Sequence, residues 1–166
     1  MRTSSIWKAA LAGAALLHVA ATAHAQGEAK VDEGALKYRQ SLMEAVGGDM
    51  AALTNILKYG LTVPGAAQVH AEGLASHAKL TTVAFERKVT AGPTDAEPAI
   101  WEKPDEFAQS VQKFEAETAK LVDVAKNGDL AALGAQVKAT GKSCGSCHDS
   151  FRKPKEESFK RKGGGS

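Results

Sequence analysis

The segment Cys144-Gly145-Ser146-Cys147-His148 restricts the possible folds of this chain more than any other segment. Two thiols three residues apart, followed directly by an imidazole, form the arrangement that attaches a c-type haem and supplies a ligand to its iron. Residues three and four apart share one face of a helix, so the three side chains can point to one side. The motif therefore predicts a helix that carries one covalent haem c, attached through Cys144 and Cys147 and ligated by His148.

A zinc site and a thiol redox pair are the other interpretations of the two cysteines. A structural zinc site needs four ligands, and beyond residue 25 the chain offers no third Cys and only His70 and His77 besides His148. His70 and His77 are interpreted as solvent-side or satisfied histidines. A thioredoxin-type pair is expected near a strand-helix-strand pattern, which the sequence lacks. A haem-free thiol redox protein stays as an alternative.

The N-terminus has the features of an export signal. Arg2 and Lys8 are basic, residues 9–21 form an apolar run, and Ala23-His24-Ala25 is a small-x-small cleavage site. The run is too short for a membrane-spanning helix, so we expect residues 1–25 to be cleaved and the protein to be periplasmic, without a membrane anchor. An uncleaved N-terminal anchor is the alternative.

Charge gives no support to a nucleic-acid partner. The expected signal holds two of the 21 Lys and Arg residues and none of the 19 Asp and Glu residues, so the remaining chain is neutral. A neutral chain lacks the basic excess that nucleic-acid and membrane-surface binding require.

Four helices and no strand are expected in residues 26–154. The predicted helices cover about Val31–Lys58, Pro64–Val89, Pro104–Asn127 and Asp129–Pro154, and residues 155–166 are expected to form a basic, Gly-rich disordered tail. The inner face of the last helix is predicted to contain Leu130, Leu133, Val137, Cys144, His148 and Phe151. Because the haem motif continues this apolar stripe, the haem is expected inside the bundle.

Three further side chains are candidates for haem contacts. Arg39 is a cation on the apolar stripe of the first helix, where it could pair with a haem propionate or extend to solvent. Met43, one turn later, could bind the iron as sixth ligand or only pack over it. Arg152 could also pair with a propionate, or belong to the solvated basic tail.

A family resemblance follows from the position and surroundings of the motif. The motif lies close to the C-terminus, on the last of the four expected helices. It is preceded by Gly128-Asp129-Leu130 and Ala139-Thr140-Gly141-Lys142-Ser143, and followed by Asp149-Ser150-Phe151-Arg152-Lys153. Together with Lys37-Tyr38-Arg39-Gln40-Ser41 in the first helix, these segments resemble the class II cytochromes c, the cytochrome c′ family.

The resemblance implies an all-α, antiparallel four-helix bundle, commonly a homodimer, in which Arg39 and Arg152 lie near the haem and Met43 occupies the distal position. A methionine there is found in the low-spin, electron-carrying members. We therefore expect a periplasmic one-electron carrier with His148 and Met43 as axial ligands, which is not an enzyme and whose redox partner the sequence does not identify. The alternative is a five-coordinate, high-spin cytochrome c′ that binds nitric oxide or carbon monoxide.

Overall fold

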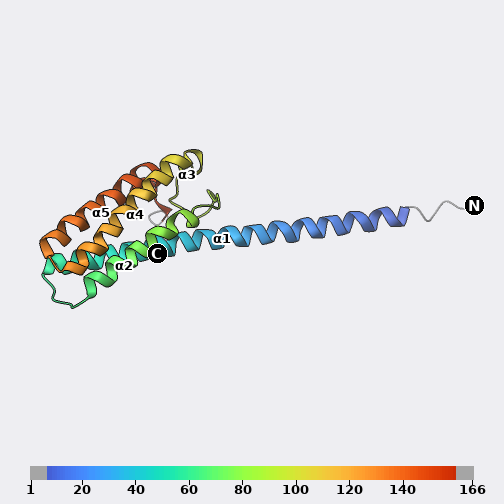
Figure 1. The fold of residues 1–166 in the computed structure, drawn as a ribbon. Helices are drawn as coiled ribbons and strands as arrows, with labels where there is room; N and C mark the ends of the chain where they lie inside the picture. Colours follow the sequence, from blue (N-terminus) through green and yellow to red (C-terminus); the bar gives the residue numbers. More distant parts are fainter. Residues whose placement is uncertain (1–6, 160–166) are drawn as a thin grey trace, which may run out of the picture. The chain divides into compact units, whose positions relative to one another are not determined.

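Helices make up most of the structure. The computed structural model describes the backbone of residues 7–159 and the side chains of residues 26–159. Its elements are α1 (Trp7–Tyr59), α2 (Ala66–Ala84), α3 (Ala99–Glu102), α4 (Pro104–Asn127), α5 (Leu130–Phe151) and the short 3-10 helix η1 (Lys155–Glu157) (Figure 1). The chain divides into two units after Ala35, and the first unit consists, where described, of the N-terminal part of α1.

The second unit, from Leu36 onward, is an antiparallel four-helix bundle. Each of α2, α4 and α5 runs opposite to the long helix that precedes it in sequence (Figure 1), and α4 packs against both α2 and α5. All four long helices contribute to one apolar cluster: Val46, Leu53, Ala71, Leu74, Ala78, Phe114, Leu121, Leu133 and Val137. This arrangement confirms the predicted fold class.

The ends of α4 and α5 follow from local sequence. Pro104 occupies the first turn of α4, where its missing N–H costs no hydrogen bond. Gly128 ends that helix with φ 72°, a left-handed conformation that glycine adopts without strain. Asp129 then caps α5, and its carboxylate accepts hydrogen bonds from the backbone N–H groups of Ala131 and Ala132 at 2.8 and 3.1 Å. These signals set the start of the helix that carries the haem motif.

Two helices differ from the predicted bounds. The first helix begins at Trp7 rather than Val31, since no proline or strong breaker interrupts the residues between. The second helix ends at Ala84 rather than Val89. The backbone carbonyls of Ala84, Arg87 and Val89 accept hydrogen bonds from the guanidinium of Arg39. These hydrogen bonds replace the final helical turn.

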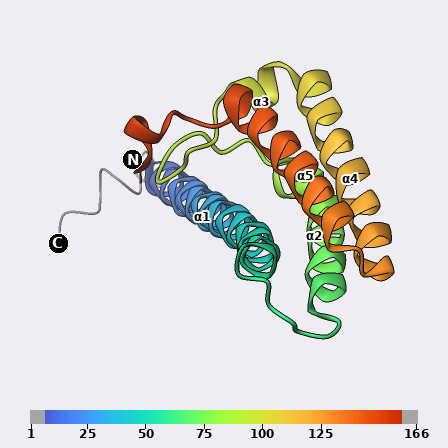
Figure 2. The same ribbon diagram turned by 90° about the vertical axis from the view of Figure 1, so that its left-hand side faces the viewer.

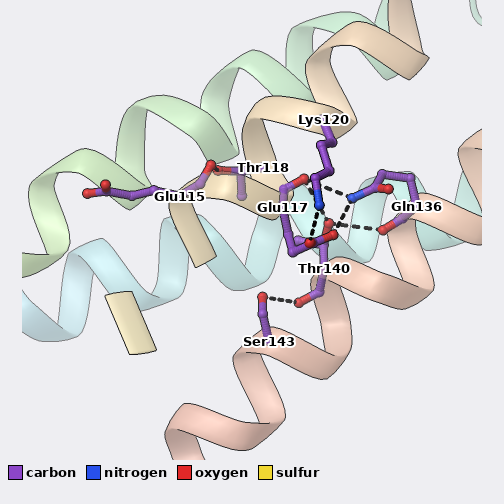
Figure 3. A network of polar contacts seen from close by, with 7 residues as sticks. All are labelled: Glu115, Glu117, Thr118, Lys120, Gln136, Thr140 and Ser143. Atoms are coloured by element: carbon purple, nitrogen blue, oxygen red, sulfur yellow. Dashed lines mark hydrogen bonds and ion pairs between the residues drawn. The ribbon is translucent and has the colours of Figure 1, made fainter. Parts of the chain in front are cut away.

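A polar network joins α4 to α5 on one side of the bundle (Figure 3). The amide of Gln136 donates to the backbone oxygen of Glu117 at 3.0 Å and to its carboxylate at 2.7 Å. Lys120 lies 2.7 Å from the same carboxylate, and the Thr140 hydroxyl reaches the Glu117 backbone oxygen at 3.4 Å. These contacts fix the register of α5 against α4 and so help to position the haem motif two turns later.

The termini differ in how far the structure describes them. Residues 1–6 and 160–166 lie outside the described part, and nothing in the structure tests cleavage after Ala25, so the cleavage of residues 1–25 and the end of the tail stay predictions. Lys155–Phe159, which the sequence assigned to the disordered tail, instead form η1 and a packed segment in which Ser158 is buried. Among the described helices, none has an apolar stretch long enough to span a bilayer.

Candidate haem-binding site

A cavity of about 480 Å³ lies inside the bundle, and its walls are mostly apolar. Val46 and Phe114 of the large apolar cluster line it, and so do Phe107, Val111 and Phe151 of a second, smaller cluster. The cavity thus lies between two packed regions. Its volume and apolar walls with a few polar groups are typical of a cofactor site.

The haem motif forms part of the α5 wall of this cavity. Cys144, Cys147 and His148 all line it, as the helical spacing of the motif predicts. Cys144 packs against the large cluster and Cys147 against the smaller one. The two thiols are therefore spread along one wall of a hollow whose donor set of two thiols and an imidazole suits a haem c.

Burial keeps the two thiols protonated near neutral pH. It raises the pKa of Cys147 to about 11, with a smaller contribution from Cys144 nearby, and it also raises the pKa of Cys144. Reactive redox cysteines have lowered pKa values, because the thiolate is the nucleophile. The surroundings of these thiols therefore disfavour the haem-free thiol redox alternative.

The surroundings of His148 favour the neutral form of its imidazole, although the residue is exposed. Desolvation by the surrounding protein lowers the pKa of His148, and the positive charge of Arg152 lowers it further, while Asp149 acts in the opposite direction. A neutral imidazole has the free nitrogen lone pair that iron ligation requires.

Met43 lines the same cavity from α1, whereas His148 lines it from α5. The side chain is half-buried and packs against the large apolar cluster. This placement fits both roles considered for it, a sixth ligand and an apolar neighbour of the distal face, so its ligation stays a prediction.

Arg39 is buried, with 3% of its surface exposed, and it does not extend to solvent. Its Nε donates to the Ala84 carbonyl at 2.9 Å and its Nη1 to the Val89 carbonyl at 3.2 Å, while Nη2 donates to the Arg87 carbonyl. The guanidinium also lies 5.2 Å from the ring centroids of both Phe85 and Trp101. Arg39 lines the cavity, so a propionate contact stays a prediction beside this structural role.

Arg152 lies at the C-terminal end of α5 and lines the cavity. Its Nη2 is 3.6 Å from a carboxylate oxygen of Asp95, in the loop before α3. Phe159 also lines the cavity. The sequence did not indicate Asp95 or Phe159 as site residues, because no local spacing links them to the haem motif. The propionate role of Arg152 stays a prediction.

His70 and His77 have a shared partner that the sequence did not indicate. Asp49 of α1 places one carboxylate oxygen 2.9 Å from Nδ1 of His70 and the other 3.3 Å from Nδ1 of His77. Within the described residues, no group of three or more His, Cys, Asp or Glu side chains is arranged to hold a metal ion. The three residues are therefore a polar link between α1 and α2.

The inner face of the last helix agrees only in part with the predicted stripe, because Cys144 is half-buried and His148 is exposed. Leu133, Val137 and Phe151 are buried. Leu130 is 58% exposed instead, because it stands in the first turn, before α5 enters the bundle.

Taken together, the bundle and its cavity define a class of protein, the helical-bundle haem proteins. The sequence profile of the family described as cytochrome C′ matches residues 34–152. A cytochrome c′ of Alcaligenes xylosoxydans is 37% identical over 125 residues, which cover 74% of this chain and 96% of that protein. A cytochrome c-554 of Cereibacter sphaeroides is 33% identical over 132 residues, 75% of this chain and 97% of that protein.

Solved structures agree with this assignment. The nitric oxide complex of a point mutant of cytochrome c prime from Alcaligenes xylosoxidans superimposes with a TM-score of 0.67 and 33% identity, covering 74% of this chain and 97% of that one. The chain therefore belongs to the cytochrome c′ family. Members of this family are haem proteins without enzymatic activity, and they carry one covalent haem c.

Proposed function

We propose that this chain is a periplasmic haem c protein that takes up a small diatomic gas, nitric oxide or carbon monoxide, on the side of the haem opposite His148. The proposal rests on the structural match to a cytochrome c prime in complex with nitric oxide. The match covers 97% of the chain of that cytochrome. The comparisons thus support the gas-binding alternative better than the electron carrier that we expected from Met43.

The residues that would hold the haem are those of the motif. Cys144 and Cys147 would form the two thioethers, and His148 would supply a nitrogen ligand to the iron. When bound, the haem supplies an iron that can take a gas as ligand or change its oxidation state. The protein contributes an imidazole whose pKa is lowered at His148, and cavity walls that are mostly apolar.

In this proposal Met43 is a packing residue rather than a ligand. Its side chain is in contact with the large apolar cluster, where a flexible thioether fills irregular space. Gly47, one turn further along α1, also lines the cavity, and a Cβ placed there would meet nothing within 4 Å. The α1 wall therefore carries no side chain at the position one turn from Met43.

A second candidate function is one-electron transfer with a low-spin haem ligated by His148 and Met43. The specific observation in its favour is that both side chains line one cavity from different helices. A methionine ligand opposite a histidine raises the reduction potential and closes the iron to gases.

The absorption spectrum of the reduced holoprotein, with and without carbon monoxide, tests the proposal. Gas binding predicts a broad band that shifts on adding carbon monoxide, and a Met43→Leu variant that behaves like the wild type. Sharp bands that ignore carbon monoxide in the wild type, and that become sensitive to it in Met43→Leu, would establish the electron carrier instead.

Dimerisation is proposed as well, on the α2 face that points away from the bundle. Val69, Leu80 and Val83 share this face at helical spacing and are 65%, 41% and 57% exposed. Exposed apolar side chains that line up in this way are typical of an interaction surface. Sedimentation at two protein concentrations, for the wild type and for Val83→Glu, tests this proposal.

A further inference from the structure

The segment that follows α5 is folded back onto the cavity. After η1, Ser158 is only 5% exposed, and Phe159 lines the cavity together with Arg152. Residues 153–159 lie outside the stretch that the family profile matches, residues 34–152. The family profile therefore does not cover this segment.

One carboxylate, that of Asp95, holds the far end of the segment. Its Oδ2 accepts a hydrogen bond from the Ser158 hydroxyl at 2.8 Å, and its Oδ1 accepts one from the backbone N–H of Phe159 at 2.9 Å. Arg152 supplies a positive charge 3.6 Å from Oδ2. The Asp95 side chain is only 13% exposed, so these charge-assisted contacts are partly sheltered from water.

Backbone contacts hold the near end of the segment to the same loop. The N–H of Lys153 donates to the backbone oxygen of Asp95 at 2.8 Å, and the N–H of Glu97 donates to the backbone oxygen of Phe151 at 3.0 Å. The Lys153 ammonium donates to the Thr94 oxygen at 3.0 Å. Both ends are thus fastened to residues 94–97, and Figure 2 shows the red C-terminal segment beside the loop that leads into α3.

We propose that residues 153–159 form a strap across part of the haem cavity, that Asp95 is the positioning residue that fastens it, and that Phe159 limits the entry of small ligands. The proposal rests on the proposed gas-binding function. A segment fastened at both ends moves less than a free C-terminus, so its aromatic side chain forms a lasting part of the cavity wall. Removing the ring, or the carboxylate that fastens the segment, should open a path to the cavity.

The test measures the rate of carbon monoxide binding to the reduced holoprotein by stopped flow. Phe159→Ala removes the ring, and Asp95→Ala removes the anchor. Glu156→Gln is the matched control, because it changes one exposed carboxylate in the same segment. We expect both Ala variants to bind carbon monoxide roughly tenfold faster, which corresponds to a small lowering of an entry barrier, and the control to match the wild type. Rates within about twofold of the wild type in both Ala variants would overturn the proposal.

A second readout separates a failure of the strap from a failure of the gas-binding function. Trypsin can cut after Lys155 only when the segment leaves its place, so Asp95→Ala should be cut there much faster than the wild type or Glu156→Gln. If the wild-type haem takes up no carbon monoxide, the gas-binding function fails, and the proteolysis rates alone judge the strap. Equal cutting of Asp95→Ala and wild type would then overturn it.

Discussion

Arg39 joins three parts of the bundle through one buried guanidinium. From α1, its guanidinium donates hydrogen bonds to the backbone carbonyls of Ala84, Arg87 and Val89. It also lies beside the rings of Phe85 and Trp101. Replacing it leaves buried carbonyls without a donor, at a cost of order 1–3 kcal/mol for each.

Arg39→Ala should therefore lower the free energy of unfolding of the holoprotein by about 3 kcal/mol or more, measured by urea denaturation. Lys113→Ala is the control, because Lys113 is exposed on α4, and its effect should stay within about 0.5 kcal/mol. A loss below about 1 kcal/mol in Arg39→Ala would show that the guanidinium is not structural.

Cys147 offers a residue-scale test that needs no haem. In protein lacking the haem, burial and, to a smaller extent, the neighbouring Cys144 raise the pKa of Cys147 to about 11, so the unreactive thiol predominates at neutral pH. Its alkylation by iodoacetamide should be slow at pH 7 and should accelerate up to about pH 11. A midpoint near the ordinary cysteine value, measured in a Cys144→Ser variant that removes the neighbouring thiol, would contradict the burial of this side chain.

At the scale of elements, Glu117 links α4 to α5 in a way that depends on pH. Hydrogen bonds from Lys120 and Gln136 lower the pKa of Glu117, against the opposing effect of burial. A carboxyl whose pKa is lower in the folded state stabilises the fold above its unfolded value of 4.5, and this contribution is lost as the pH falls through the lowered value.

Glu117→Gln should therefore reduce the urea midpoint at pH 7, and its difference from the wild type should shrink as the pH falls well below 4.5. Glu115→Gln makes the same change of charge on a side chain that points away from the network (Figure 3). A difference between Glu117→Gln and wild type that stays constant with pH would contradict the linkage.

Gly73 marks the contact between α1 and α2. A Cβ at this position would lie 2.7 Å from the Asp49 carboxylate, which His70 holds in place. Gly→Ala in a helix normally stabilises by up to about 1 kcal/mol. Because the added methyl must displace Asp49, we expect Gly73→Ala to be destabilising, whereas Gly48→Ala, with nothing within 4 Å of its Cβ, should be stabilising.

An Asp49→Ala background completes this test. There the obstruction is gone, so adding Gly73→Ala should raise the thermal midpoint. An equal gain from Gly73→Ala with and without Asp49 would show that the carboxylate does not occupy the space above Gly73.

The elements themselves were largely predictable from local signals. Pro104 and Asp129 are recognisable signals for the starts of α4 and α5, and Gly128 is one for the end of α4. The end of α2 was not predictable, because it depends on carbonyls turning toward Arg39 on another helix. The one-turn helix α3 was missed as well, since four residues between prolines show no periodicity.

At the scale of the whole molecule, the motif Cys144-Gly145-Ser146-Cys147-His148 and its helical spacing predicted the α5 wall of the cavity. The contacts that complete the site come from distant segments. Asp95 and Phe159 reach the cavity only through the folded loop and C-terminal strap, and Asp49 reaches His70 across the α1–α2 interface. Sequence spacing carries no information about such pairs.

The coordination of the haem iron depends on the packing of the whole molecule. This packing sets the distance between α1 and the face of the haem that lies opposite α5. Met43 and His148 share the cavity, and the gas-binding proposal requires that the Met43 sulfur stays off the iron. The ferric holoprotein is the form in which this difference is most visible, since a sixth strong ligand changes the spin state.

Electron paramagnetic resonance of the ferric holoprotein, purified from the periplasm, measures this coordination most directly. A five-coordinate haem with an open side predicts a high-spin signal that Met43→Leu leaves unchanged. A low-spin signal in the wild type that turns high-spin in Met43→Leu would contradict the gas-binding account and assign the protein to one-electron transfer.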